Sequence, residues 1–189
     1  MYNTVNKTVF LDRDNTLIYD KGYTYKTDDL SWITGSINCL QSFVSKGFKL
    51  VVITNQSGVA RGYYNEKQLN KFHRYMNADL FQKTNISIDK FYYWPHFLEG
   101  KVSRYRKKCN CRKPGNKLFK QAIAELLIDP KSSIVIGNNI TDIIPAFDSG
   151  VCKGYLLNNN PDSSPFCYKD PKKKIINVNN WDEIIENND

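Results

Sequence analysis

The stretch KTVFLDRDNTLIYDKGY, residues 7–23, decides the fold because an apolar run within it ends at two acidic residues. Val9 to Leu11 do not alternate with polar residues, which predicts a strand buried on both faces. Asp12 and Asp14 follow directly, and in an extended chain alternate side chains point the same way. Two neighbouring carboxylates repel each other unless a cation or proton lies between them, so the pair predicts a Mg²⁺ site.

Further buried strands are predicted from short apolar runs at residues 50–53, 91–94, 133–136 and 151–157. Apolar residues recur at helical spacing between them, in residues 37–44, 69–80 and 118–127. Asn65, with Gln68 three residues later, is the predicted start of the second helix, and Gly47 ends the first. This alternation predicts a Rossmann-like three-layer αβα sandwich with a central parallel sheet, formed by a single domain over residues 1–189.

The composition narrows the class of protein. Lys and Arg number 27 against 19 Asp and Glu, and the net charge of +8 favours anionic partners without choosing among them. A basic run at residues 101–113 is interpreted mainly as a solvated face, and aromatic residues do not interleave with it as in a nucleic-acid platform.

No apolar run is long enough to cross a bilayer, and residues 1–10 lack the apolar core of a signal peptide. Five cysteines, an odd number, agree with a reducing compartment. We therefore expect a cytoplasmic monomer that binds neither nucleic acid nor membrane.

Polar residues also follow two other predicted strands, in ITNQSG (residues 53–58) and IGNNITD (residues 136–142). Ligands gather at the carboxyl ends of strands in an open α/β sheet, so these segments should converge on Asp12. Asp12 is then a candidate nucleophile for attack on phosphorus, and Asp14 a candidate acid and base. Thr54 and Asn55 offer hydrogen-bond donors to phosphoryl oxygens, and Lys113 offers a cation. The alternative is that both aspartates only cap a loop.

The segments FLDRDNT, VVITNQSGVARGYY, CNCRKP and IGNNITD, in this order and spacing, resemble phosphatases of the haloacid dehalogenase superfamily. The resemblance covers residues 8–157 and is strongest to the small, capless branch that acts on histidinol phosphate and heptose bisphosphates. It implies a Mg²⁺-dependent phosphoric monoester hydrolase that removes the 7-phosphate of D-glycero-D-manno-heptose 1,7-bisphosphate. The reaction would pass through an aspartyl-phosphate and serve nucleotide-heptose synthesis for bacterial surface polysaccharide such as lipopolysaccharide.

The same resemblance implies roles for individual residues. Asp12, Asp14, Thr54 and Lys113 would be catalytic. The substrate would contact Asp20, Lys21, Gly22, Tyr23, Thr54, Asn55, Gln56, Ser57, Arg112 and Lys113. Magnesium would lie on the Asp12 carboxylate, the Asp14 backbone carbonyl and Asn138. Tyr23 and Arg61 are equally well interpreted as ordinary surface residues.

Three positions depart from the family pattern. Asn15 replaces a glycine, and asparagine tolerates a left-handed backbone better than most residues. Asn138 replaces a carboxylate, which should raise the magnesium requirement unless Asp142 supplies charge. Trp94 replaces a cysteine of a zinc cluster, leaving His96, Cys109 and Cys111 in the loop at residues 95–114. Structural zinc normally takes four ligands, so the loop either binds zinc with an outside ligand or is held by Trp94 instead.

Two rival functions stay open. One is hydrolysis of histidinol phosphate or another small phosphoester, which relative rates on the two substrates would distinguish. The other, motivated by Asn138 and the incomplete zinc cluster, is a catalytically silent protein that binds a sugar phosphate without releasing phosphate.

Overall fold

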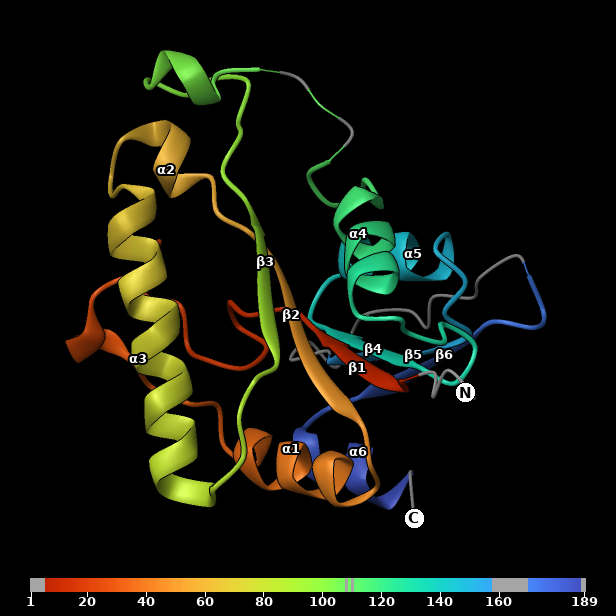
Figure 1. The fold of residues 1–189 in the computed structure, drawn as a ribbon. Coiled ribbons are helices and arrows are strands. Elements are labelled where there is room, and N and C mark those ends of the chain that lie inside the picture. Colours follow the sequence, from red (N-terminus) through yellow and green to blue (C-terminus); the bar gives the residue numbers. More distant parts are fainter. Residues whose placement is uncertain (1–5, 108, 110, 158–169, 188–189) are drawn as a thin grey trace.

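The computed structural model describes residues 6–107, 109, 111–157 and 170–187 of the chain (Figure 1). Lys108, one member of the predicted basic run, lies outside the described residues. In chain order the elements are β1 (Thr8–Leu11), α1 (Ser36–Ser45), β2 (Lys49–Asn55), α2 (Gly58–Arg61), α3 (Glu66–Thr84), β3 (Lys90–Trp94), α4 (Lys117–Glu125), β4 (Ile134–Gly137), α5 (Ile140–Phe147), β5 (Lys153–Leu157), β6 (Lys174–Val178) and α6 (Trp181–Glu186). Short 3-10 turns occur at Thr27–Asp29 and Ser103–Tyr105. No helix in the described part of the chain combines the length and apolar character needed to cross a membrane.

The strands form one six-stranded sheet in the order β3-β2-β1-β4-β5-β6, and every neighbouring pair is parallel. The five strands predicted from apolar runs are confirmed to within two residues at each end. β1 lies at the centre between β2 and β4, so all four of its residues are buried. The three predicted polar segments therefore leave the sheet at neighbouring positions on the same edge.

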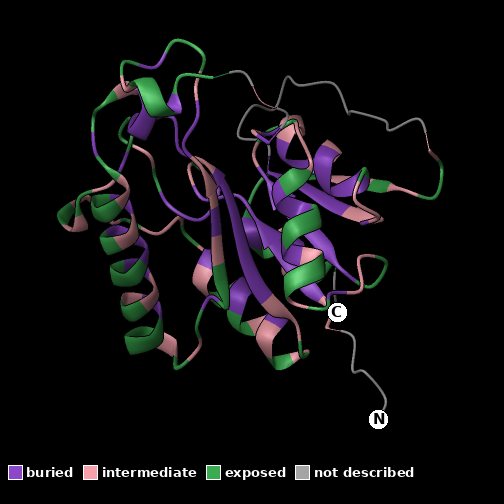
Figure 2. Cartoon of the chain, turned by 45° about the horizontal axis from the view of Figure 1, so that its top comes forward, coloured by how far each residue is buried: buried purple, intermediate pink, exposed green. Residues whose placement is uncertain are grey.

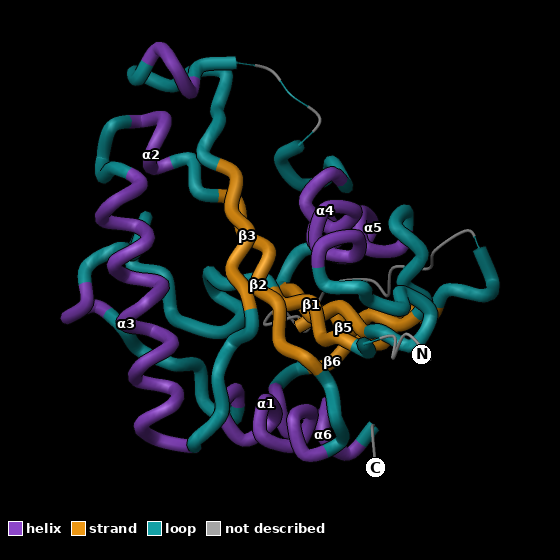
Figure 3. Tube along the Cα trace, in the orientation of Figure 1, coloured by secondary structure: helices purple, strands orange, loops and turns teal. Residues whose placement is uncertain are grey.

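Helices cover both faces of the sheet, as the alternating pattern predicted (Figures 1 and 3). On one face, α1, α3 and α6 bury Leu40, Phe72 and Trp181 against the strands. On the other face, Phe119 of α4 and Phe147 of α5 form a second apolar cluster. The sheet is buried along most of its length between these layers (Figure 2). Burial of this apolar surface is the main force that holds the strand ends in a fixed relation.

The predicted helix starts and ends are mostly confirmed. Asn65 accepts a hydrogen bond from the Gln68 backbone at 2.9 Å, and the Gln68 side chain caps the Asn65 N–H at 2.9 Å. The third predicted helix was too long, because α4 ends at Glu125 and Leu127 is 60% exposed. Leu127 takes a left-handed φ of 50°, and Ile128 donates its N–H back to Ile123 at 3.0 Å. This reversal buries Ile128 where a continued helix would have buried Leu127.

The sequence patterns did not predict β6 or the helices α2, α5 and α6. Of these, β6 and α6 complete the core at the C-terminal side of the sheet. Trp181 is 1% exposed and donates its indole N–H to the Thr16 backbone carbonyl at 3.0 Å. The C-terminal helix therefore supports the turn that follows β1. β6 was missed because most of its residues are only half-buried or exposed, so its sequence lacks a continuous apolar run.

The loop at residues 95–114 is packed against the body in its described part. Tyr105 is buried and donates its hydroxyl to Glu66 of α3 at 2.5 Å. Phe97 and Tyr105 are joined through their backbones at 3.1 Å, and Val102 bonds to Ala60 of α2 at 2.9 Å. These contacts hold the described part of the loop against α2 and α3.

Candidate active site

Asp12 lies at the carboxyl end of β1 and is 8% exposed. One of its carboxylate oxygens accepts a hydrogen bond from the Lys113 ammonium at 2.5 Å, and the other accepts from the Thr16 hydroxyl at 3.3 Å. Burial raises the pKa of Asp12 to about 6, since the lowering effect of Lys113 only partly offsets the loss of water. Asp12 is thus a desolvated carboxylate with its orientation set by Lys113.

Lys113 brings the basic loop to the sheet edge. Its ammonium contacts Asp12, the Ile53 carbonyl at 2.8 Å and Asp142 at 2.7 Å, which uses all three of its donors. Burial acts to lower the pKa of Lys113, but the charges of Asp12 and Asp142 outweigh it and raise that pKa above its usual range. The ion pairs therefore keep the ammonium charged at 5% exposure.

Asn55 fixes the backbone of Lys113. Its side-chain oxygen accepts from the Lys113 N–H at 3.0 Å, and its amide donates to the Lys113 carbonyl at 3.2 Å. Two bonds to one residue restrain both the position and the rotation of that backbone. The end of β2 therefore determines where a lysine from a distant loop enters the site.

Both carboxylate oxygens of Asp14 accept hydrogen bonds from neighbouring side chains. The fully buried Arg13 donates twice to one oxygen, at 2.9 and 2.8 Å. The Gln56 amide and the Thr54 hydroxyl donate to the other, at 2.8 and 3.3 Å. Burial raises the pKa of Asp14, and the Arg13 charge offsets this only in part. An aspartate with a raised pKa and a fixed geometry is suited to hold and release a proton.

Gln56 is the centre of this hydrogen-bond network. Its oxygen accepts from the Tyr64 hydroxyl at 2.5 Å and from Arg13 at 3.2 Å, while its amide also contacts Thr54 at 2.9 Å. The side chain is 2% exposed. The structure thus brings Thr54 and Gln56 to Asp14, while Ser57, also expected to contact substrate, precedes the short helix α2.

The turn after β1 keeps its shape despite the missing glycine. Asn15 has a left-handed φ of 55°, as expected, and its side chain accepts from the Asp20 N–H at 3.0 Å. Asp20 in turn accepts from the Thr24 N–H and hydroxyl at 2.8 and 2.7 Å. Gly22 and Tyr23 follow with φ of 93° and 62°, and Lys21 turns to Asp29 at 3.3 Å. The predicted substrate loop is therefore a compact turn beside the site.

Oxygen atoms that suit magnesium meet at the ends of β1 and β4. The Thr16 hydroxyl lies 3.3 Å from one Asp12 oxygen and 3.4 Å from the Asn138 side-chain oxygen. One hydroxyl proton cannot serve both acceptors, and Mg²⁺ prefers carboxylate and carbonyl oxygens. The Asp12 and Asn138 oxygens thus fit the cation. Asp142 pairs with Lys113, which also contacts the other Asp12 oxygen, and it accepts from the Asn139 N–H at 3.1 Å.

Two arginines at the rim have buried donors without partners among the described residues. These atoms are Arg61 Nε and Arg112 Nη1. Both guanidinium groups contact the Phe97 ring, with centroid distances of 4.1 and 5.6 Å, and Arg61 also lies 5.8 Å from the Tyr23 ring. Burial and then the Arg61 charge lower the pKa of Arg112. Arg61 is half-buried, and two like charges with unused donors are suited to an anion.

Two of the three expected zinc residues, His96 and Cys109, lie close together, and Trp94 lies beside them. Cys109 Sγ lies 3.9 Å from His96 Nδ1 and accepts the Trp94 indole N–H at 2.7 Å. Cys111 is buried and interacts electrostatically with Cys109. Across the described ranges, no three His, Cys, Asp or Glu side chains form a cluster that could hold a metal ion. At the position where the family has a fourth zinc-binding cysteine, Trp94 instead donates its indole N–H to the sulfur of Cys109.

Sequence reasoning did not single out Arg13, although this residue organises Asp14. Its signal was available in the quoted motif, because an arginine that follows a fully buried strand must find acceptors inside the protein. Asp142 was expected only as a source of charge, and the structure shows that its carboxylate pairs with Lys113.

The parallel α/β sheet, which carries the aspartate pair and the buried lysine at its carboxyl edge, has the haloacid dehalogenase-like fold. The family model described as polynucleotide kinase 3 phosphatase matches residues 7–149, and the chain belongs to this family. The expected membership in this phosphatase superfamily is confirmed.

Relatives named as heptose bisphosphate phosphatases are similar to most of the chain. D-glycero-β-D-manno-heptose-1,7-bisphosphate 7-phosphatase from Haemophilus ducreyi is 43% identical over 145 residues, 77% of this chain and 79% of that protein. The protein of the same name from Escherichia coli K12 is 36% identical over 143 residues, 76% and 74% of the two chains. A crystal structure of D,D-heptose 1,7-bisphosphate phosphatase from B. bronchiseptica, complexed with magnesium and phosphate, has a TM-score of 0.76 at 22% identity, covering 96% and 97%.

Proposed function

We propose that this protein is a phosphatase that removes the 7-phosphate from D-glycero-D-manno-heptose 1,7-bisphosphate. The observation that carries the proposal is the buried contact of Asp12 with Lys113 beside the fixed Asp14. The relatives named for this activity support the choice of substrate. Residues 1–189 would act as one catalytic domain. We also propose a cytoplasmic location, because an odd number of cysteines, five, agrees with a reducing compartment.

Asp12 is the proposed nucleophile. Its carboxylate attacks phosphorus, forming an aspartyl-phosphate as the bond from phosphorus to the sugar oxygen breaks. Lys113 holds one carboxylate oxygen at 2.5 Å, which orients the group and offsets negative charge on the transferring phosphoryl group. The ammonium remains charged there because Asp142 also pairs with it.

Asp14 is the proposed acid and base. It gives its proton to the leaving sugar oxygen, and it then takes a proton from the water that attacks the aspartyl-phosphate. The Thr54 and Gln56 donors restrain one of its oxygens, and Arg13 restrains the other. Both steps use the same fixed carboxyl group, so no second acid is required.

Magnesium would be held by the Asp12 carboxylate, the Asp14 backbone carbonyl and the Asn138 side-chain oxygen. When bound, it would neutralise charge between Asp12 and the substrate phosphate. Asn138 is neutral where a carboxylate would be charged, so a higher magnesium concentration should be required. Asn138→Asp should lower the half-saturating concentration several-fold. Equal half-saturation in the two proteins would contradict the role of Asn138.

A bisphosphate substrate suits the rim arginines. Arg61 and Arg112 have buried donors without described partners and lie together against Phe97. We propose that they bind the phosphate that is not hydrolysed. A substrate with one phosphate would leave these charges uncompensated, which distinguishes heptose bisphosphate from histidinol phosphate.

For the loop at residues 95–114, we propose that His96, Cys109 and Cys111 bind zinc only weakly. Trp94 donates to the Cys109 sulfur at 2.7 Å and so competes for the atom that zinc would use. Structural zinc sites are normally closed by four ligands, and Trp94 supplies none. The Tyr105 contact with Glu66 anchors the loop independently of a metal.

The decisive experiment is a phosphate-release assay on both anomers of the heptose bisphosphate, with histidinol phosphate in parallel. We expect turnover that depends on magnesium and a higher kcat/KM for the bisphosphate. A higher kcat/KM for histidinol phosphate would support the rival phosphatase. Substrate binding without release at any magnesium concentration would support the silent sugar-phosphate binder.

A further inference from the structure

The carboxyl group of Asp14 reaches the protein surface, whereas the side chains that hold it from behind are buried. The Asp14 side chain is 23% exposed, and that of Arg13 is fully buried. Gln56 is 2% exposed and Tyr64 is 5% exposed. The carboxyl group can therefore meet a substrate on one side while its orientation is set from the interior on the other.

Gln56 uses all of its hydrogen-bonding capacity. Its two amide protons are donated to Asp14 at 2.8 Å and to Thr54 at 2.9 Å. Its oxygen accepts from Tyr64 at 2.5 Å and from Arg13 at 3.2 Å. Rotation of the amide by half a turn would bring its oxygen toward the Asp14 carboxylate and its protons toward Arg13, which only donates. The Tyr64 and Arg13 donors therefore keep the Gln56 amide with its protons facing Asp14.

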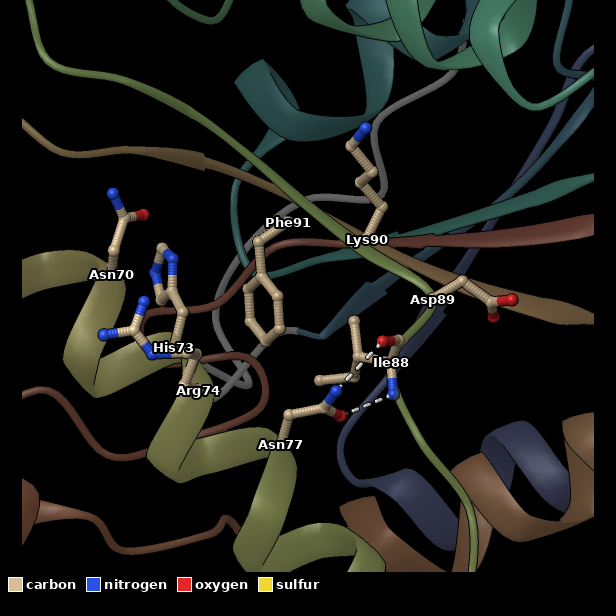
Figure 4. A pocket seen from close by; sticks show the side chains of 8 residues that line it. All are labelled: Asn70, His73, Arg74, Asn77, Ile88, Asp89, Lys90 and Phe91. Atoms are coloured by element: carbon tan, nitrogen blue, oxygen red, sulfur yellow. Dashed lines mark hydrogen bonds between the residues drawn. The ribbon is translucent and has the colours of Figure 1, made fainter.

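Arg13 is itself anchored by further bonds. One of its nitrogens donates to the Thr24 carbonyl at 2.9 Å. Another lies 3.0 Å from His73 Nε2, and because a guanidinium only donates, the histidine is the acceptor. Figure 4 shows His73 projecting from α3 toward the Phe91 ring of β3, on which it stacks with ring centroids 4.5 Å apart. Arg13 therefore has little freedom to move closer to the Gln56 oxygen.

Tyr64 is held so that its hydroxyl meets Gln56. Its ring stacks on Tyr25, with ring centroids 4.7 Å apart. A Cβ atom at Gly58 would overlap the Tyr64 ring, so the ring occupies space that only glycine leaves free. Burial raises the pKa of Tyr64 above its usual range, so the hydroxyl keeps its proton and donates a hydrogen bond. The ring position and the protonated hydroxyl together direct one bond to the Gln56 oxygen.

We propose that Tyr64 is a positioning residue for proton transfer by Asp14, acting through Gln56. Its hydroxyl fixes the amide, and the amide N–H holds the Asp14 carboxyl group where it can give its proton to the leaving sugar oxygen. The bond from Tyr64 also polarises the amide and so strengthens the bond from Gln56 to Asp14. The inference rests on the proposed function, because that function makes Asp14 the acid.

The first test changes the need of the leaving group for a proton. Tyr64→Phe removes the hydroxyl and keeps the ring with its Tyr25 contact. A sugar oxygen must be protonated as its bond to phosphorus breaks, whereas 4-nitrophenolate is stable as an anion and leaves without a proton. We expect kcat/KM of the variant to fall about tenfold for the heptose bisphosphate and to stay within about twofold of wild type for 4-nitrophenyl phosphate.

A merely structural role of Tyr64 would lower both values of kcat/KM alike. Equal losses on the two substrates, or no loss on the heptose bisphosphate, would therefore overturn the proposal. Tyr75→Phe, which removes an exposed hydroxyl from α3, is the matched control. It should leave both values unchanged.

A second measurement does not depend on turnover. The chain has five glutamines, and ¹⁵N labelling of their side chains allows proton exchange with solvent at Gln56 to be followed beside the other four. The Gln56 signal is identified by its loss in Gln56→Glu. We expect exchange at Gln56 to be at least about tenfold faster in Tyr64→Phe, because the amide loses one of its bonds, and unchanged at the other glutamines. Unchanged exchange at Gln56 would overturn the positioning role.

Failure of this inference and failure of the proposed function give different results. A wild type that releases phosphate from neither substrate would overturn the proposed function together with the acid role of Asp14. An active wild type whose Gln56 amide does not respond to Tyr64→Phe would overturn this inference and leave the proposed function.

Discussion

The floor of the site and its rim differ in how their charges are satisfied. On the floor, Asp12 and Lys113 are buried, Asp14 is half-buried, and each contacts an opposite charge. At the rim, Arg61 and Arg112 have buried donors without described partners. A charge with a partner inside the protein is held in place before substrate arrives. A charge without one is best satisfied by a ligand, so the floor is suited to chemistry and the rim to recognition.

Asp12→Asn should have the largest effect, because it removes the nucleophile from the floor. We expect kcat to fall by about 10³-fold or more while the protein remains folded. Phosphate release with saturating substrate and magnesium measures the effect, and Asp28→Asn, an exposed acid, is the matched control. Full turnover in Asp12→Asn would remove the basis of the proposed mechanism.

Arg112→Ala should separate the rim from the floor. Loss of a charge-assisted contact should reduce kcat/KM for the heptose bisphosphate by about 10- to 100-fold. The same variant should hydrolyse heptose 7-phosphate, which has no second phosphate, at close to the wild-type kcat/KM. Arg104→Ala, a basic residue of the same loop, serves as control. Equal losses on both substrates would mean that Arg112 acts in the chemical step.

Trp94→Cys should restore a four-ligand zinc cluster with His96, Cys109 and Cys111, next to the rim residue Arg112. We expect zinc in the purified wild type well below one ion per chain, and about one ion in the variant. Metal analysis of protein prepared without added zinc measures both, with Trp94→Phe as the control that removes the indole N–H without adding a thiolate. One tightly bound zinc in the wild type would contradict the weak-binding proposal.

The smallest expected effect is the pH dependence that His73 gives to stability. Its native pKa lies below the unfolded value of about 6.5, so below that pH the unfolded chain gains a proton that the native protein does not. Stability should therefore fall on acidification, by roughly 1 kcal/mol between pH 6.5 and 5.5. Denaturant unfolding of wild type and His73→Gln at both pH values measures the difference. An equal pH dependence in both proteins would assign the titration to other groups.

The central strands and the catalytic aspartates were predictable because their signals are local. Val9 to Leu11 form a continuous apolar run, and Asp12 and Asp14 follow it within three residues. The start of helix α3 was equally predictable, since Asn65 and Gln68 are only three residues apart and form a capping box in its first turn. In contrast, β6 has no continuous apolar run, and the turn at Leu127 depends on burying Ile128 instead.

By itself, the sequence determined the order of β1 to β5 and of α1, α3 and α4, and the residue types that reach the carboxyl edge of the sheet. The spacing of apolar residues and the polar residues that follow each apolar run are properties of neighbouring positions, so they can be detected without the tertiary structure. Only the tertiary structure decided that Asn55 clamps Lys113, that Arg13 joins Asp14 to His73, and that Trp94 contacts Cys109. These pairings depend on packing between distant segments, and burial gives each polar group a strong requirement for whichever partner the fold brings near.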